Sequence, residues 1–223
     1  MEDGKVMIDI LYEDNHLIVV NKKPNIPVQK DDSGDLDLLT IMKNYIKEKY
    51  NKPGNVYLGL VHRLDRPVSG IMVFAKTSKA ASRLSKQIRE GKMKKTYHAV
   101  VEGNIKEKGT FVDNLLKDHK ENKTIVHRDG KESILEYEKI KYLENMSLVK
   151  INLITGRSHQ IRVQFSSRNY PLYGDHKYNK NCKDKLNIAL ISTELSFYHP
   201  TTKEILAFKL ELPKRKPFSS FKI

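Results

Sequence analysis

Apolar and polar positions alternate along much of this chain, and the alternation predicts a protein built mainly from short β-strands. Segments with a period of two, or with a continuous run of β-branched and aromatic residues, are found at residues 8–12, 16–21, 56–61, 71–75, 97–102, 111–116, 123–127, 134–142, 147–154, 188–198 and 205–210. Polar residues that favour turns separate neighbouring segments at 13–15, 129–130 and 144–145. Hairpins are therefore expected at these positions.

A helical period appears in three segments only. The first follows residue 37 and has its apolar side chains on one face, at positions 38, 39, 41, 42, 45 and 46. The second helix is expected over 78–89, with Ser78 as its N-cap and Gly91 as its C-terminal stop. The third is expected over 158–167, opened by Thr155 or Ser158.

Hairpin connections outnumber strand–helix–strand crossovers in this order of elements. The order predicts an α+β fold, in which a few helices and loops flank a mixed, mostly antiparallel β-sheet. No stretch has the composition of a linker, so residues 1–223 are expected to form a single domain. The segment 213–223, rich in Lys, Pro and Ser, is expected to be a tail.

The net charge of the chain indicates what kind of molecule it binds. The chain has 41 Lys and Arg against 27 Asp and Glu, a formal net charge of +14. Cationic side chains that neutralise phosphates release counterions and gain affinity, so this excess favours a polyanionic partner such as nucleic acid. A lysine-rich composition inherited from an AT-rich genome would give the same charge, and that alternative stays open.

The chain has no feature of a secreted or membrane protein. Its single cysteine, Cys182, cannot form an internal disulfide. Residues 1–7 are polar and acidic, without an apolar signal core. The longest apolar run, 71–75, is far shorter than the roughly 20 residues of a membrane helix. We therefore expect a cytoplasmic protein with no membrane partner.

The densest polar cluster in an apolar context lies at residues 62–70, between two expected core strands. Buried charges are costly unless they are paired, and functional residues often lie on loops held by rigid strands. Asp65 stands between Arg63 and Arg66, whose positive charges would keep its carboxylate ionised. A salt bridge that merely anchors the loop explains the same residues equally well.

A second polar cluster lies at residues 155–162, where a strand ends and a short helix is expected. Arg157 and Arg162 bring positive charge to a helix start, a place that favours anions. A capped helix with solvated arginines is the alternative. The basic run 92–95 either guides RNA or is a solvated turn, and Tyr97 after it would by itself be taken for a core tyrosine.

Together these segments resemble the motifs of the RluA family of pseudouridine synthases. Residues 62–70 are similar to the family's His-Arg-Leu-Asp-Arg-x-Thr-Ser-Gly signature, and residues 156–163 to its Gly-Arg-Thr/Ser-His-Gln-Ile/Leu-Arg-Val segment. Residues 95–99 match a Lys-x-Tyr-x-Ala strand, 171–178 match Pro-x-x-Gly-Asp-x-x-Tyr, and 195–200 resemble a late strand that ends in His-Pro. Order and spacing agree from about residue 11 to residue 213.

The resemblance implies the pseudouridine synthase catalytic fold and an isomerase that converts uridines of structured RNA, either rRNA or tRNA, to pseudouridine. By resemblance, Asp65 is the catalytic carboxylate, Tyr97 lies against the flipped base and Arg162 pairs with Asp65. The implied substrate contacts are Arg63, His62 and Arg157. Isomerisation gains and loses no atom, so no cofactor is expected, and no metal either. The family also suggests a monomer without an obligatory protein partner.

Departures from the family pattern are few. Val68 stands where the family usually has Thr, Gln164 where His is common, and Ile191 where a His often precedes the late strand. Many relatives carry an N-terminal S4-type RNA-binding domain. Here the pattern begins near residue 10, so no such domain is expected.

Two other function classes stay open at this point. A catalytically idle RNA-binding module would keep the fold, but it would have no evident need for Asp65, Tyr97 and Arg162 together. A metal-dependent nuclease would require a cluster of carboxylates. The histidines at 62 and 159 have no zinc-ligand spacing, and the arginines around Asp65 would repel a cation.

Overall fold

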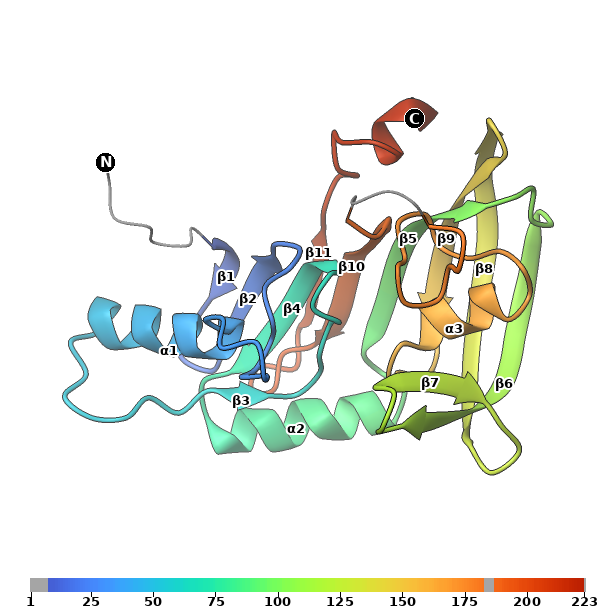
Figure 1. Cartoon of the computed structure of the whole chain (residues 1–223). Coiled ribbons are helices and arrows are strands. Elements are labelled where there is room, and N and C mark those ends of the chain that lie inside the picture. Colours follow the sequence, from blue (N-terminus) through green and yellow to red (C-terminus); the bar gives the residue numbers. More distant parts are fainter. Residues whose placement is uncertain (1–7, 183–186, 223) are drawn as a thin grey trace. The chain divides into compact units, whose positions relative to one another are not determined.

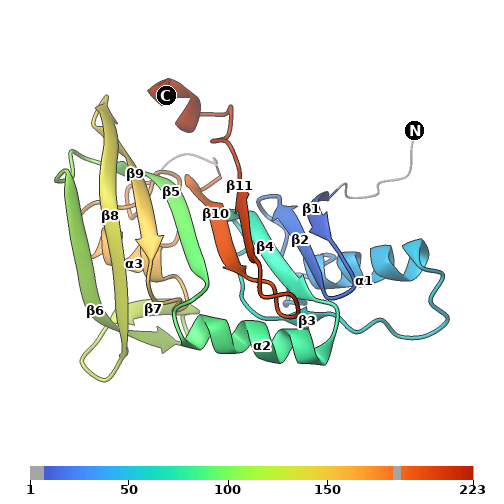
Figure 2. The same ribbon diagram turned by 180° about the vertical axis from the view of Figure 1, so that it is seen from behind.

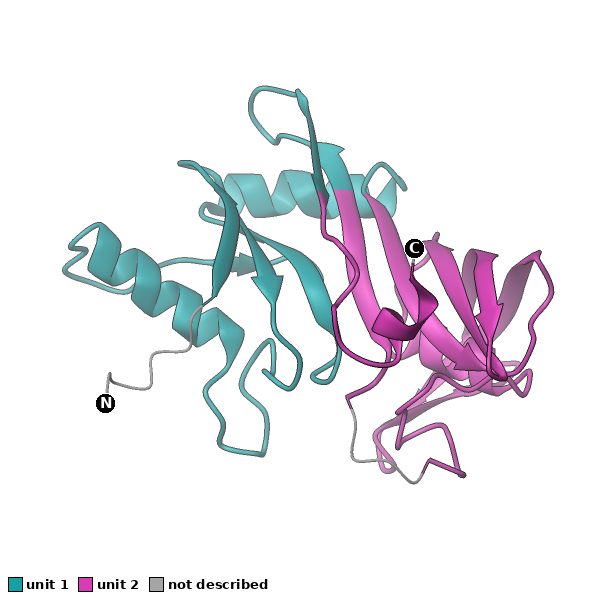
Figure 3. Cartoon of the chain, turned by 90° about the horizontal axis from the view of Figure 1, so that it is seen from above, with its two compact units in different colours: residues 1–93, 196–208 teal, residues 94–195, 209–223 magenta. Residues whose placement is uncertain are grey.

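A computed structural model of the chain describes residues 8–182 and 187–222 (Figures 1 and 2). The expectation for residues 1–7 concerns a segment outside the described residues. The chain divides into two compact units (Figure 3): unit 1 comprises residues 1–93 and 196–208, and unit 2 comprises residues 94–195 and 209–223. That these units together form a single domain stays a prediction.

Unit 1 is built on a short antiparallel sheet. Its strands are β1 (Asp9–Glu13), β2 (Leu17–Lys22), β3 (Gly59–Leu60) and β4 (Ser69–Ala75). β2 pairs with β1 and β4, and β3 pairs with β4. Every residue of β4 is buried, which explains its uninterrupted apolar run, because a strand covered on both faces has no polar face.

The strand predicted at 56–61 is much shorter in the structure. Only Gly59 and Leu60 pair with β4. The backbone N–H of Val73 on β4 donates instead to Nε2 of His62, at 3.1 Å. The His62 side chain thus accepts the hydrogen bond that a longer β3 would have accepted through its backbone, and the chain continues into the loop 61–68.

Two helices belong to unit 1, α1 (Leu38–Lys49) and α2 (Ser78–Arg89). The predicted cap of α2 was wrong by one residue: Thr77 is the N-cap, with extended backbone, and its hydroxyl accepts from the N–H of Ala80 at 3.1 Å. The predicted stop was correct, since Gly91 takes the left-handed conformation (φ +65°) that glycine adopts most readily.

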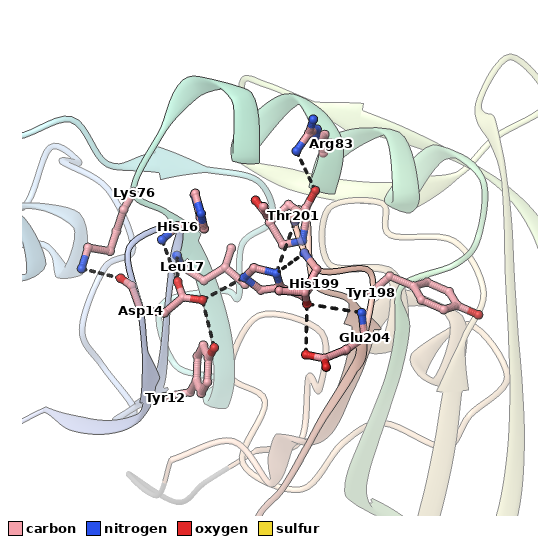
Figure 4. A network of polar contacts seen from close by, with 12 residues as sticks. Tyr12, Asp14, His16, Leu17, Lys76, Arg83, Tyr198, His199, Thr201 and Glu204 are labelled. Atoms are coloured by element: carbon pink, nitrogen blue, oxygen red, sulfur yellow. Dashed lines mark hydrogen bonds and ion pairs between the residues drawn. The ribbon is translucent and has the colours of Figure 1, made fainter.

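Asp14 and His199 join two turns of unit 1 (Figure 4). Nε2 of His199 lies 2.8 Å from Asp14 Oδ2, which also accepts from the Tyr12 hydroxyl at 2.9 Å. Nδ1 of His199 accepts from the N–H of Thr202 at 2.9 Å, so the ring proton lies on Nε2 and is donated to Asp14. This network gives the histidine at the end of the late strand a structural role.

Unit 2 contains an antiparallel sheet of long strands and one short helix. In order of pairing, the strands are β5 (Lys94–Glu102), β9 (Met146–Leu153), β8 (Lys131–Leu143), β6 (Lys108–Asp118) and β7 (Lys123–Val126). Helix α3 (Gln160–Ser166) packs against β6 and β7 (Figure 1). The hairpin of β10 (Leu190–Tyr198) and β11 (Ile205–Lys209) contributes residues to both units.

This arrangement confirms the α+β prediction with a mostly antiparallel sheet. The predicted tail was wrong. Phe218 and Phe221 form a 3₁₀ turn (Phe218–Phe221) and are buried against Val100, Leu148 and Ile191 of unit 2. Two phenylalanines bury enough apolar area to hold a segment that is otherwise Lys-rich. No helix in the described residues is long and apolar enough to cross a bilayer.

Candidate active site

Asp65 lies in the loop of unit 1 between β3 and β4, and backbone hydrogen bonds fix its position. Its carbonyl accepts from the N–H of Val68 at 3.0 Å, which closes a turn around Arg66. The carbonyl of Arg66 accepts twice, from the N–H of Asn25 at 2.9 Å and from Nζ of Lys22 at 2.9 Å. Both lone pairs of this carbonyl are therefore used, and the half-buried Asp65 is attached to a rigid turn.

Lys22 is the group that anchors this turn, and its side chain is fully buried. Nζ donates to two backbone carbonyls, those of Lys23 (3.0 Å) and Arg66 (2.9 Å). Burial lowers the pKa of Lys22 to about 7, although the negative charge of Asp65 raises it. The charged form of Lys22 is therefore stabilised by Asp65. Sequence reasoning missed this role because nothing in the sequence marks Lys22 as buried.

The arginines around Asp65 have partners in the loop 22–35. Arg66 forms ion pairs with Asp35 and, at 3.4 Å, with Asp31. Arg63 is exposed and donates from Nη1 to Gln29 Oε1 at 3.2 Å. Arg–Asp ion pairs thus anchor the loop that carries Asp65, as the salt-bridge interpretation of residues 62–70 expected. The acidic partners of Arg66, however, are Asp31 and Asp35, which lie outside that cluster.

Arg162 lies on α3 in unit 2 and is buried against Asp175. Its Nε donates to Asp175 Oδ2 at 2.9 Å and its Nη2 to Oδ1 at 2.7 Å, a two-pronged contact that fixes the guanidinium plane. Asp175 also accepts from the N–H of Lys177 at 3.0 Å. The ring of Tyr178 lies under the guanidinium, with 5.1 Å from Cζ to the ring centroid. The Gly-Asp-x-x-Tyr segment therefore orients Arg162.

Tyr97 is buried on β5 in unit 2, where it shares a strand face with Lys95 and Ala99. Arg157 lies before α3 and is exposed; its Nε donates to the carbonyl of Glu132 at 3.1 Å. The predicted site residues thus fall into two groups, His62, Arg63 and Asp65 in unit 1, and Tyr97, Arg157 and Arg162 in unit 2. The pairing of Asp65 with Arg162 stays a prediction.

The predicted caps of α3 were wrong. The N-cap is His159, in the left-handed conformation (φ +52°) and without a capping side chain. Thr155 instead donates to Gln160 Oε1 at 2.8 Å, and Gln160 Oε1 also accepts from the N–H of Arg157 at 3.0 Å. The amide of Gln160 thus holds the segment before the helix in place and does not cap the free N–H groups of the first turn.

No group of three or more His, Cys, Asp or Glu side chains among the described residues converges in a way that would hold a metal ion.

The profile of the family described as RNA pseudouridylate synthase matches residues 16–167. The uncharacterized RNA pseudouridine synthase YjbO of Bacillus subtilis is 37% identical over 217 residues, which cover 94% of this chain and 74% of that protein. The chain belongs to the RNA pseudouridylate synthase family. It is an RNA-modifying isomerase, and the resemblance to the RluA family is confirmed.

Two further relatives of this pseudouridine synthase come from Buchnera aphidicola subsp. Baizongia pistaciae. Ribosomal large subunit pseudouridine synthase C is 38% identical, with 87% of this chain and 64% of that protein covered. Ribosomal large subunit pseudouridine synthase D is 32% identical, with 94% and 70% covered. Among solved structures, human RNA Pseudouridylate Synthase Domain Containing 1 superimposes with a TM-score of 0.78 at 23% identity, over 99% of this chain and 90% of that chain, which supports the fold.

The three departures from the family pattern occupy buried positions of the pseudouridine synthase. Val68 and Ile191 are buried apolar residues, and Ile191 packs against Phe218 and Phe221. Gln164 is fully buried and donates to Asp113 Oδ2 at 2.8 Å and to the carbonyl of Ser133 at 3.1 Å. These side chains therefore serve packing and hydrogen bonding within their own units.

Proposed function

We propose that this enzyme isomerises specific uridines of large-subunit ribosomal RNA to pseudouridine, with Asp65 as its catalytic carboxylate. The observation that carries the choice of RNA is the pair of relatives named as ribosomal large subunit synthases C and D, at 38% and 32% identity. The net charge of +14 suits a polyanionic substrate. Transfer RNA is the alternative substrate class, and the experiment below separates the two.

The reaction breaks the bond between uracil N1 and ribose C1′, turns the base, and rejoins it to C1′ through C5. A base in folded RNA must first leave its stack, which costs a few kcal/mol. Asp65 then acts on the ribose, either by attack on C1′ or by abstraction of a ribose proton. Both routes begin from an ionised carboxylate. Asp65 in turn stabilises the charged form of the buried Lys22.

The remaining residues have auxiliary roles in this proposal. Tyr97 stacks on the flipped base, an interaction of about 1–3 kcal/mol. Arg162, oriented by Asp175, stabilises the negative charge of Asp65. Arg63 is exposed and available to RNA, in the space that the base vacates. Weaker substrate contacts are assigned to His62 and Arg157.

We further propose that the enzyme acts as a monomer in the cytoplasm, needs no obligatory protein partner, and uses no cofactor. The last point follows from the chemistry, since isomerisation is balanced in atoms and electrons without a second reactant.

Purified protein incubated with unmodified transcripts tests the function. One sample contains large-subunit rRNA and the other a mixture of tRNAs, and pseudouridine is mapped chemically at single-nucleotide resolution. We expect one or a few rRNA uridines to be modified by the wild type and none by Asp65→Asn, whose RNA affinity stays within about twofold because little volume changes. Modification of tRNA alone would reassign the substrate, and turnover by Asp65→Asn would reject the catalytic role.

A further inference from the structure

Lys95 is a lysine buried in unit 2. Only 8% of its surface is exposed, and it lies on β5 two residues before Tyr97. In the described part of the chain, no hydrogen bond, ion pair or ring contact reaches this side chain. Burial lowers the pKa of Lys95. A buried ammonium with three unused donors is costly, and such groups are usually paired.

The tip of Lys95 lies beside Gly156. A Cβ atom added to Gly156 would be 3.1 Å from Nζ of Lys95, which is closer than most side-chain contacts. Gly156 does not have the left-handed conformation that demands glycine, so the small size of the residue is what matters here. Gly156 is itself exposed. Nζ therefore lies next to a surface position at which no side chain covers it.

The segment around Gly156 is held firmly in place. Thr155 exchanges hydrogen bonds with the backbone of Ile134 on β8, at 2.8 and 3.1 Å. The Gln160 amide accepts from Thr155 and from the N–H of Arg157, as described above. The position of Gly156 relative to Lys95 is thus fixed by the sheet rather than by a flexible loop.

We propose that Lys95 and the uncovered position at Gly156 form a binding site for one phosphate of the RNA substrate. The inference rests on the function proposed above, because it takes RNA as the ligand. Lys95 shares its strand face with Tyr97, so the site lies along the strand from the proposed base-stacking residue, two residues or about 7 Å away. A phosphate there would fix the register of the substrate strand relative to Tyr97.

The charge of the ligand follows from the chemistry of the site. A ribose hydroxyl or a uracil carbonyl would satisfy one donor but leave the positive charge uncompensated. A phosphate supplies both acceptors and the opposite charge. The two possibilities differ in salt dependence, because a phosphate contact releases a counterion and a neutral contact does not.

The test compares Lys95→Met with Lys150→Met, both in the Asp65→Asn background so that the RNA is not turned over. Lys150 is an exposed residue of β9 that pairs with His98, on the strand face opposite to Lys95. Both variants remove one positive charge. Affinity for transcribed large-subunit rRNA is measured by filter binding over a series of salt concentrations, together with thermal unfolding.

For Lys95→Met we expect roughly tenfold weaker binding and a salt slope, log Kd against log salt, that is smaller by about 0.7–0.9. Its thermal midpoint should rise by roughly 2–4 °C, because an unpaired buried charge is replaced by an apolar chain of similar shape. Lys150→Met should bind within about twofold, with an unchanged midpoint. A lysine with a purely structural role would lower the midpoint when removed.

Equal salt slopes for the two variants, or weaker binding of Lys95→Met with an unchanged slope, would overturn the phosphate site. If Lys95→Met does not fold, Gly156→Ala keeps the charge but places a methyl group at Nζ, and it is expected to lose the same increment of salt slope. Turnover by the wild-type enzyme is measured separately. Turnover without a Lys95 effect rejects this inference alone, whereas a Lys95 effect without pseudouridine formation rejects the proposed function alone.

Discussion

Lys22 is the residue whose environment differs most from what its type would suggest. A fully buried lysine beneath the Asp65 loop, bonded to two carbonyls, needs only the two N–H donors of a neutral amine. The hydrogen bonds therefore persist whether or not the side chain is charged. Its charge is kept in part by the nearby carboxylate of Asp65. The sequence shows this position only as the first of two lysines before Pro24. Burial of the ammonium depends on the whole loop and cannot be seen from the sequence.

The stability of the protein should report the titration of Lys22. Its pKa is about 7 in the folded protein and near 10.4 in an unfolded chain. Between these values the unfolded chain binds one more proton, so the free energy of unfolding rises with pH, by at most about 1.4 kcal/mol per pH unit. The destabilisation is complete below about pH 7. Lys22→Met should lack this rise, as urea unfolding at several pH values would reveal.

The matched control is Lys23→Met, since Lys23 is exposed and pairs with Asp9. Lys23→Met should follow the pH dependence of the wild type. If the difference in unfolding free energy between wild type and Lys22→Met were the same at every pH, Lys22 would not titrate in this range, and the burial argument would fail.

At the scale of single elements, helix α3 depends on one buried ion pair. Asp175 is 1% exposed and holds Arg162 through two hydrogen bonds. Asp175→Asn would replace the carboxylate by a neutral amide that has one acceptor oxygen, and would leave the charge of the buried guanidinium uncompensated. Such a loss typically costs about 3–5 kcal/mol. Glu90→Gln is the control, because Glu90 and its partner Lys92 are both exposed, and we expect a much smaller loss. Denaturant unfolding measures both. Equal losses would mean that burial of the pair does not set its contribution.

The elements also separate what a sequence pattern can predict from what it cannot. The apolar run 71–75 predicted a buried strand correctly, since its pattern depends only on both faces being covered. The end of β3 was not predictable, because it depends on a hydrogen bond from the N–H of Val73 to the ring of His62, two residues that are eleven positions apart in the sequence. The basic run 92–95 looked uniform in sequence, yet the strand pleat buries Lys95 and leaves Lys94 exposed.

The same distinction holds for the candidate site. Asp65, Tyr97 and Arg162 were named from motifs that need no knowledge of packing. Asp175 lies in a recognised motif, but its role as the partner of Arg162 required the fold, because the two residues are thirteen positions apart. Lys95 stands in a recognised motif, but its burial, like that of Lys22, is a property of the surroundings rather than of the residue.

For the whole molecule, the boundary between the units predicts how the protein unfolds. The boundary passes through β10 and β11, so neither unit can unfold without breaking strands that also belong to the other. We therefore expect a single calorimetric transition, with a calorimetric enthalpy equal to the van't Hoff enthalpy. Two transitions, or a calorimetric enthalpy well above the van't Hoff value, would contradict the single-domain prediction.

The net charge of +14 is the second property of the whole molecule, and its meaning depends on how RNA binding responds to salt. If much of the excess contacts phosphates, the affinity of Asp65→Asn for large-subunit rRNA should fall by at least about a hundredfold between roughly 50 and 200 mM salt, as it does for proteins with several phosphate contacts. The slope of log Kd against log salt should be larger than the value of about 0.7–0.9 that one phosphate contact of Lys95 would contribute. A weak dependence, with a slope near one, would mean that about one phosphate is contacted and that most of the lysines reflect composition.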